Sequence, residues 1–300
     1  MDFLTWLLIA LAVIIVLYLA VGAVAAFTLT KVGDHPQYDD DPGTYGLEFE
    51  AVYFQSRVDG LKISGWYIPK PNAERAIVLV HGRNASKQNA ISGKLPQLAA
   101  ELHAAGLAVL MIDLRGHGES EGKRYTFGVH ERRDVLGAVD FLLEKGFGVG
   151  QIGVLGISLG GAAVISAAVE EPAIGAVVVE STFADINALI EPNWKAESGL
   201  PRLFLPGVFW MVRLLMGFDL RDVKSVEQMV QIPPRPILIL HSWADEMVDV
   251  QHAYALKNAV PDAELVIFND CDHAELFRDC PQAYLEALIP FLLDRWAGSP

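Results

Sequence analysis

Hydrophobic and polar positions form two kinds of pattern along this chain, and each pattern predicts a kind of secondary structure. From Phe49 to Lys70, apolar and polar residues alternate around Asp59-Gly60, which is typical of two antiparallel strands joined by a tight turn. Further along, short runs carry apolar residues on both faces, as expected of strands that are covered on both sides. These runs are Ala76–Val80, Ala108–Ile112, Ile152–Leu155, Ala176–Val179, Ile237–Leu240 and Glu264–Phe268.

Segments with helical spacing lie between these strands. They are Leu95–Ala105, His130–Lys145, Ala162–Glu170, His252–Ala259 and a terminal Gln282–Trp296. Alternating strands and helices build parallel sheets covered by helices, so the pattern predicts an α/β fold over residues 48–298. The expected sheet is mostly parallel and doubly wound, with antiparallel N-terminal strands. Sites in such sheets form at the carboxyl ends of the strands.

Residues 1–30 have a different character, because no charged residue occurs between Phe3 and Thr30. A helix of this length, rising about 1.5 Å per residue, spans a hydrocarbon core of roughly 30 Å. We therefore expect a single-pass transmembrane anchor over 1–30 and a polar linker over 31–47. The alternatives are a buried core helix and a signal peptide cleaved near Ala23-Val24-Ala25. Only Lys31 adjoins the span, so the side of the membrane stays open.

One long segment, at about residues 183–232, interrupts the alternation and contains no clear strand. It is dense in Phe, Trp, Leu and Met, which predicts a helical cap insertion over the active-site end of the sheet rather than a structureless loop. A second membrane segment is the alternative, and Arg202, Arg213 and several Gly or Pro breaks argue against it.

Charge and cysteine content narrow the classes of partner and cofactor. The net charge is −14 and no stretch is rich in Lys or Arg, which argues against nucleic acid or an anionic membrane surface as a partner. Cys271 and Cys280 form no Cys-x-x-Cys motif, so neither a zinc site nor a thioredoxin-type redox site is indicated. We expect no metal and no cofactor. We expect two ordinary thiols, with one disulfide as the alternative in an oxidising compartment.

The candidate nucleophile is Ser158, in the motif Gly156-Ile157-Ser158-Leu159-Gly160. The motif follows a predicted strand and precedes a predicted helix, where a nucleophile must adopt a strained backbone between small neighbours. No lysine follows as in a phosphate loop, and Ser158 replaces the second glycine of a dinucleotide motif. Helix capping by the serine remains the plain alternative.

A nucleophilic serine needs a base and a group that orients the base, in the chain order Ser, acid, His for this geometry. Asp245 follows the strand Ile237–Leu240, and His273 follows the strand Glu264–Phe268, so the three side chains can converge. Glu180 is the rival acid. Other nearby candidates are Asp249, Asp270, Asp272 and His241.

An oxyanion would need two backbone donors. The N–H of Leu159 directly follows the nucleophile, and the N–H of Arg83 lies in the loop after the strand Ala76–Val80. The side chain of Arg83 either reaches a substrate carboxylate or points to solvent.

Taken together, "LVHGRNAS", "DLRGHGES", "GISLGGA", "HSWADEMV" and "DHAELF" resemble successive motifs of the α/β-hydrolase superfamily. The branch that fits best comprises membrane-anchored hydrolases related to serine aminopeptidases and prolyl oligopeptidases. The resemblance implies Ser158 as nucleophile, Asp245 as acid, His273 as base and a structural role for His117. Ser242 and Asp249 depart from the Gly and Pro that are frequent in the family.

These observations predict a serine hydrolase that cleaves carboxylic esters, with hydrophobic acyl or lipid-like esters favoured by the apolar insertion and the anchor. Thioesters and peptides are alternative substrates. A non-catalytic, membrane-tethered binding protein of the same fold is the alternative of another class, and such proteins usually carry a broken set of catalytic residues.

Overall fold

The computed structural model describes residues 2–33 and 38–296 and divides the chain into two compact units. The helical unit comprises Met1–Lys31 and Ile186–Val223, and the sheet unit comprises Val32–Asp185 and Lys224–Pro300. Residue 1 of the predicted anchor, residues 34–37 of the predicted linker and residues 297–298 of the predicted hydrolase domain lie outside the described residues. The predicted domain boundaries therefore stay a prediction.

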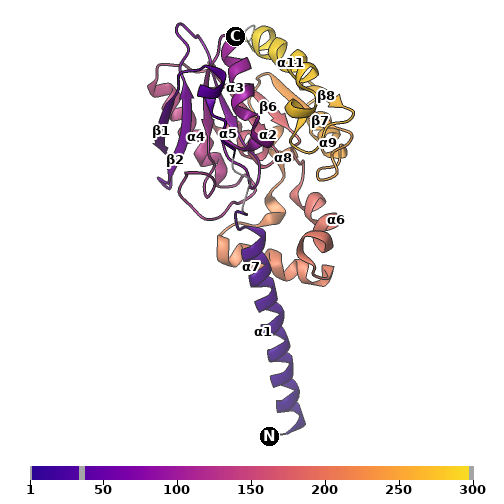
Figure 1. Ribbon diagram of the computed structural model, residues 1–300. Helices are drawn as coiled ribbons and strands as arrows, with labels where there is room; N and C mark the ends of the chain where they lie inside the picture. The colour runs from indigo at the N-terminus through magenta and orange to yellow at the C-terminus, as the bar shows by residue number, and fades with distance from the viewer. Residues whose placement is uncertain (1, 34–37, 297–300) are drawn as a thin grey trace. The chain divides into compact units, whose positions relative to one another are not determined.

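The sheet unit contains an eight-stranded sheet in the order β1-β2-β4-β3-β5-β6-β7-β8 (Figure 1). β1 and β2 form the antiparallel hairpin, β2 pairs antiparallel with β4, and all later neighbours are parallel. This confirms the predicted α/β fold. The strands are β1 (Glu50–Gln55), β2 (Lys62–Ile68), β3 (Ala76–Val80), β4 (Ala108–Ile112), β5 (Ile152–Ile157), β6 (Ile174–Glu180), β7 (Ile237–Ser242) and β8 (Glu264–Phe268).

Register places the carboxyl ends of the parallel strands at one edge of the sheet. Val80 of β3 lies opposite Gly156 of β5, and Ile157 lies opposite Glu180 of β6. Glu180 in turn pairs with Leu240 of β7. The loops that follow β3, β5, β6 and β7 therefore begin at the same level, which is the condition for their side chains to meet.

Helices cover both faces of the sheet because the strands alternate buried side chains to either side. On one face α3 (Leu95–Ala104) and α11 (Pro281–Pro290) pack on the odd-numbered residues of β3, β4 and β5. The other face carries α4 (Glu131–Glu144) and α5 (Leu159–Glu170). The predicted terminal helix stops short: α11 ends at Pro290, which lacks an N–H, and the chain continues to Arg295 as a wider π turn.

Shorter helices complete the sheet unit. They are α2 (Ala90–Gly93), α8 (Ser225–Met229), α9 (Gln251–Ala259) and α10 (Leu276–Asp279).

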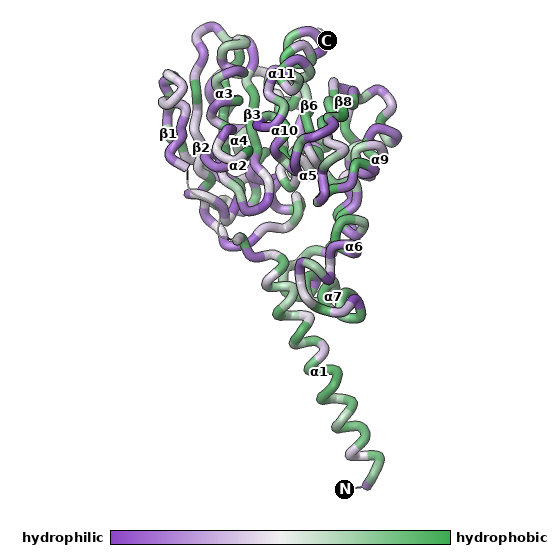
Figure 2. The backbone as a smooth tube through the Cα atoms, turned by 45° about the vertical axis from the view of Figure 1, so that its right-hand side comes forward, coloured by the Kyte–Doolittle hydropathy of each residue, from purple (hydrophilic) through white to green (hydrophobic). Residues whose placement is uncertain are grey.

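The helical unit contains α1 (Phe3–Leu29), α6 (Ile186–Ser198), α7 (Leu205–Met216) and the short 3-10 turns η2 (Arg202–Phe204) and η3 (Leu220–Asp222). Residues 181–236 are all described, and they form helices and turns without a strand. Figure 2 shows α1 as an almost continuous apolar helix. α1 is long and apolar enough to span a membrane, a property that a signal sequence or a buried core helix can share.

Candidate active site

Ser158 lies on a strained turn between β5 and α5. Its backbone has φ 52° and ψ −111°, a combination that a residue with a side chain rarely adopts. The N–H of Ser158 donates to the carbonyl of Glu180 on the neighbouring strand at 2.7 Å, which fixes the turn to the sheet. Its side chain makes no capping hydrogen bond to α5, so the plain capping interpretation is wrong.

The glycines around Ser158 are required by backbone contacts. A Cβ on Gly156 would lie 2.3 Å from the carbonyl oxygen of Gly160, and one on Gly160 would lie 2.5 Å from the carbonyl oxygens of Val80 and His81. Gly161 serves close helix–sheet packing, because a Cβ there would collide with Thr182. The motif thus combines a strained serine with glycines two positions before and after it, where a side chain would collide with the backbone.

The structure brings Ser158, His273 and Asp245 into one hydrogen-bonded chain. His273 Nε2 lies 3.0 Å from Ser158 Oγ, and His273 Nδ1 lies 2.8 Å from Asp245 Oδ2. The three residues come from the loops after β5, β7 and β8, as the order of the motifs predicted. A carboxylate that accepts from Nδ1 leaves the lone pair of Nε2 directed at the serine, which is the arrangement for removing its proton.

Asp245 is held as a carboxylate although its side chain is fully buried. Burial by itself would raise the pKa of Asp245, but the hydrogen bonds from His273 and from the backbone N–H of Val248 oppose it, and the pKa lies below its ordinary value. Oδ1 accepts from the N–H groups of Met247 and Val248 at 3.0 and 2.8 Å. These two donors fix the rotation of the carboxylate, so Oδ2 faces the imidazole.

His241 supports this loop rather than the serine. Its Nε2 lies 2.7 Å from the carbonyl oxygen of Val248 and 3.7 Å from Asp245 Oδ2. Burial lowers the pKa of His241, which keeps the ring neutral near pH 7 and its Nε2–H donating to Val248.

The rival acids have other partners. Glu180 is fully buried, and its two oxygens accept from Tyr284 Oη at 2.8 Å and from the N–H of Leu276 at 3.3 Å. Burial raises its pKa to about 7. Asp249 accepts from the N–H of Gln251 at the start of α9, and Asp272 faces Arg278. Among these described carboxylates, Asp245 is the one that contacts His273.

The loop after β3, residues 81–84, lies beside Ser158. A Cβ on Gly82 would lie 3.3 Å from Ser158 Cβ. Two buried histidines shape this loop: His81 Nε2 accepts from the N–H of Leu114, so its Nδ1–H donates to Gly82 O. Likewise His117 Nε2 accepts from the N–H of Asn84, which agrees with a structural role for His117. Arg83 lies between Gly82 and Asn84, and its role as an oxyanion donor with Leu159 stays a prediction.

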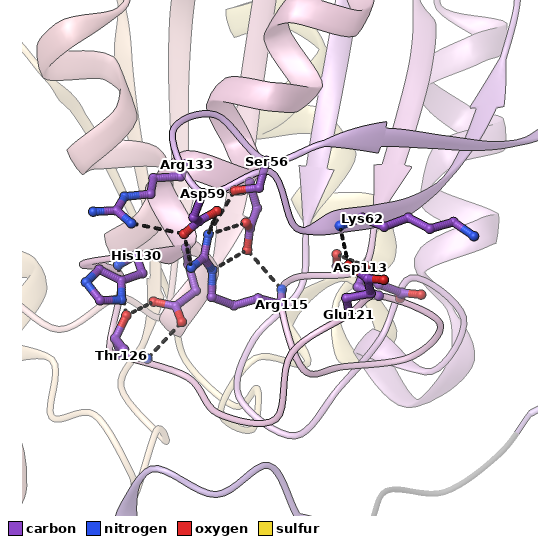
Figure 3. A network of polar contacts seen from close by, with 12 residues as sticks. Ser56, Asp59, Lys62, Asp113, Arg115, Glu121, Thr126, His130 and Arg133 are labelled. Carbon is purple, nitrogen blue, oxygen red and sulfur yellow. Dashed lines mark hydrogen bonds and ion pairs between the residues drawn. The ribbon is translucent and has the colours of Figure 1, made fainter. Parts of the chain in front are cut away.

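The loop that carries His117 is fixed by a buried polar network (Figure 3). Arg115 donates to Asp134 at 2.7 Å and to Asp59 at 2.8 Å, and Asp134 is fully buried. The hydrogen bonds from Arg115 and Arg133 outweigh burial and lower the pKa of Asp59 to about 2. Nearby, Lys87 Nζ donates to the buried Asp113 at 2.6 Å. Sequence reasoning missed these pairs, because their charged residues lie far apart in the chain.

Cys271 and Cys280 form a disulfide, so the expectation of two free thiols is wrong. The short helix α10 turns the chain back, which brings the two Cα atoms to 6.7 Å, within the range for a bridge. The bridged segment contains His273. Ala274, directly after it, has φ +60° and donates to Ser181 Oγ at 3.3 Å. The base is therefore carried by a loop that is tied at several points.

Among the described residues, no group of three or more His, Cys, Asp or Glu side chains is arranged to hold a metal ion. The site instead brings together a serine hydroxyl, an imidazole and a carboxylate in one hydrogen-bonded chain.

An eight-stranded, mostly parallel sheet with a strained serine after its central strand defines an α/β hydrolase. Residues 71–233 match the family model described as serine aminopeptidase, S33, and the chain belongs to this family. The matched range includes Ser158 but ends before Asp245 and His273, so it is the structure that adds these two residues to the serine.

Three known proteins illustrate the relationship. The uncharacterized protein YfhR of Salmonella typhi is 28% identical over 90% of this chain and 91% of its own length. Thiohydrolase aneE of Aspergillus aculeatus is 34% identical over 49% of this chain and 46% of its own. The solved structure of the Pyrococcus furiosus esterase Pf2001 superposes with a TM-score of 0.72, covering 89% of this chain and all of that one at 22% identity. The structural likeness shows that this chain shares the fold of Pf2001, and the family model makes it a member of the α/β hydrolases.

Proposed function

We propose that this protein is a serine hydrolase that cleaves carboxylic esters through an acyl-enzyme on Ser158. The hydrogen-bonded chain from Ser158 through His273 to Asp245 is the observation that carries the proposal. It also favours the hydrolase over a non-catalytic binding protein of the same fold, because binding would require neither the strained serine nor the aligned imidazole.

In the first half-reaction Ser158 Oγ attacks the acyl carbonyl carbon while His273 Nε2 takes the hydroxyl proton. The backbone N–H groups of Leu159 and Arg83 receive the oxyanion that forms on the carbonyl oxygen. The imidazolium then gives its proton to the leaving alcohol oxygen as the ester C–O bond breaks. Asp245 stays ionised throughout, orients the imidazole and stabilises its positive charge.

In the second half-reaction a water molecule takes the place of the alcohol. His273 removes a proton from the water as its oxygen attacks the acyl carbon, and then returns that proton to Ser158 Oγ. The products are a carboxylic acid and an alcohol, and the enzyme returns to its starting state.

Esters with hydrophobic acyl groups are the proposed substrates, supported by the apolar composition of residues 183–232. A thioester is the second candidate, favoured by the likeness to the thiohydrolase aneE over half of this chain. A peptide is the third, favoured by the family description. A panel of p-nitrophenyl esters from acetate to laurate, one acyl thioester and one peptide anilide separates the three, with the highest kcat/KM expected for a medium or long ester.

The proposal includes a membrane anchor formed by α1. Two hydrogen bonds support a retained helix over a cleaved signal peptide: Tyr18 Oη donates to the carbonyl of Leu203 at 2.9 Å and accepts from the N–H of Gly207 at 3.0 Å. Cleavage after Ala25 would remove Tyr18 from this contact. The mass of the protein purified from membranes tests the point, since a chain that begins beyond residue 25 contradicts the anchor.

A fluorophosphonate probe tests the nucleophile. Wild-type protein and Ser166→Ala, a control at a buried serine on the same helix, should label equally, whereas Ser158→Ala should not label. Failure of the wild type to label, or labelling of Ser158→Ala at the wild-type level, would refute the serine mechanism.

A further inference from the structure

In the helical unit, α1 packs closely against η2 and α7, which are far from it in the sequence. Tyr18 of α1 bonds both Leu203 and Gly207, and its ring stacks on Phe204 with centroids 5.4 Å apart. One turn later Gly22 faces Gly207, where an added Cβ would lie 3.0 Å from the Gly207 carbonyl oxygen. α7 therefore meets the C-terminal half of α1 at glycine-to-glycine distance. Figures 1 and 2 show α7 beside this half of α1.

The length of α1 that stays uncovered is too short for a membrane. From Phe3 to Leu17 every residue except Thr5 is exposed, and burial begins at Tyr18. These residues span roughly 22 Å at 1.5 Å per residue, against a hydrocarbon core of roughly 30 Å. The missing length of roughly 8 Å is about five further residues. A span that begins at Phe3 would therefore extend to Gly22, the level at which α7 contacts α1.

Large apolar side chains are exposed on η2 and α7, the elements that contact α1 at this level. Leu203, Trp210 and Leu214 are 62%, 50% and 61% exposed, although each is large and apolar. On α7, Trp210 and Leu214 lie on one face at i and i+4, next to the positions that contact α1, and Leu215 beside them is 42% exposed. Arg213 lies on the same side of α7, and its guanidinium pairs with Asp219 at 3.4 Å while the apolar stem stays exposed beside Leu214. Tryptophan is typical of the membrane interface.

The helices of the insertion also have the hydropathy of a membrane segment. Residues Ile186–Ser198 and Arg202–Met216 together are apolar enough to pass for one span, but they are bent by 120° at the break between them. Such a bend suits a segment that enters a bilayer and returns, and it does not suit a straight crossing.

We propose that α7 lies in the phospholipid bilayer beside α1, at the boundary between hydrocarbon and headgroups, with Trp210 and Leu214 in contact with lipid. This inference rests on the proposed membrane anchor. It makes the helical unit a membrane-embedded platform in which the anchor and the insertion form one structure. The insertion is then held at the membrane by its own apolar side chains as well as by the contact between α7 and α1.

Spin labels can test the depth of α7 in the full-length protein. Single cysteines replace Leu214 on α7, Ile14 on α1 and Val149 in the sheet unit, all of which are exposed. The native cysteines are paired and do not react. Each variant is labelled with a nitroxide and reconstituted into phosphatidylcholine vesicles. Collision rates with oxygen, which partitions into lipid, and with a nickel chelate, which stays in water, then report depth. Unchanged melting temperatures exclude misfolding.

Labels at Ile14 and Leu214 should collide severalfold more with oxygen than with nickel, and the label at Val149 should show the reverse. If Leu214 behaves like Val149 while Ile14 is in lipid, the bilayer position of α7 is wrong and the anchor stands. If Ile14 also faces water, the anchor itself is wrong. A label at Leu214 that is shielded from both agents would mean that protein, such as a second copy, covers α7, which also overturns the proposal.

A glycine substitution tests whether α1 holds α7 at that depth. In the Leu214→Cys background, Gly22→Leu places a side chain against the Gly207 backbone and should raise the nickel collision rate of the label severalfold. Val24→Leu is the matched control, because Val24 is exposed on the same helix. Equal rates in the two variants would refute the role of the α1–α7 contact.

Discussion

Replacing Asp245 by asparagine changes one atom at the centre of the proposed mechanism. In the native structure Oδ1 accepts from the N–H groups of Met247 and Val248, and Oδ2 faces Nδ1 of His273 at 2.8 Å. The two backbone donors require an acceptor, so the asparagine oxygen should take the position of Oδ1. The amide NH₂ then faces the imidazole, and a donor faces Nδ1 where an acceptor stood.

The consequence is a change of tautomer. His273 accepts the amide hydrogen at Nδ1 and carries its own proton on Nε2, which lies 3.0 Å from Ser158 Oγ. A protonated Nε2 cannot take the serine proton, so the base is lost while the packing is preserved. Loss of the correct tautomer typically lowers kcat by about 10⁴, and at 1.36 kcal/mol per factor of ten this is about 5 kcal/mol of transition-state stabilisation.

Hydrolysis of p-nitrophenyl butyrate measures the effect, with kcat and KM determined separately. Asp249→Asn is the matched control: this exposed carboxylate lies in the same loop and accepts only the N–H of Gln251 in the described contacts. It should keep kcat within about twofold, because a surface substitution away from the site changes little. The melting temperature of Asp245→Asn should stay close to that of the wild type.

Near-normal turnover of Asp245→Asn would refute the reasoning, since the orienting group would then have to be another residue. A loss of the same size in Asp249→Asn would also refute it, because the effect would then belong to the loop and not to the tautomer. If Glu180→Gln alone reproduced the loss, Glu180 would be the acid in place of Asp245.

Three further predictions concern the supporting structure. Glu180 has a folded-state pKa of about 7 against an ordinary value of 4.5, so its ionisation opposes folding above that ordinary value. The free energy of unfolding of Glu180→Gln, minus that of the wild type, should therefore rise by up to about 3 kcal/mol between pH 4 and pH 8. Urea unfolding at both pH values measures this difference, and a difference that does not change with pH would contradict the reasoning. Arg115→Met leaves the buried Asp134 unpaired and should cost about 3–5 kcal/mol, whereas Arg295→Met at an exposed pair should cost less than about 1 kcal/mol in the same assay. Gly161→Ala places a Cβ against Thr182 and should lower the melting temperature by several degrees at a cost of about 1–3 kcal/mol; an unchanged melting temperature would contradict the packing role.

The sequence predicted the framework of the sheet unit because the relevant signals are local. A strand that is buried on both faces must be apolar at every position, so runs such as Ala76–Val80 and Ile237–Leu240 are visible without any contact information. The turn at Ser158 is visible for the same reason: a strained residue needs small neighbours within a few positions along the chain. The order of Ser158, Asp245 and His273 then followed from the strands that precede them.

The supporting shell of the site could not be predicted in this way. Tyr284 meets Glu180 across 104 positions, and Lys87 meets Asp113 across 26 positions. A buried glutamate and a buried lysine look like surface residues in the sequence, since nothing local marks the partner that makes their burial possible. The disulfide is not visible in the sequence, because only the turn of α10 brings Cys271 and Cys280 together.

By itself the sequence determined the alternation of strands and helices, the strained serine and the apolar opening helix, because each depends on the conformational preferences of neighbouring residues. The tertiary structure decided which acid faces His273, how the loops beside Ser158 are held, and that Tyr18 and Gly22 pack on Gly207. These outcomes depend on contacts between distant segments. Such contacts form only when the whole chain has packed, so no short stretch of residues records them.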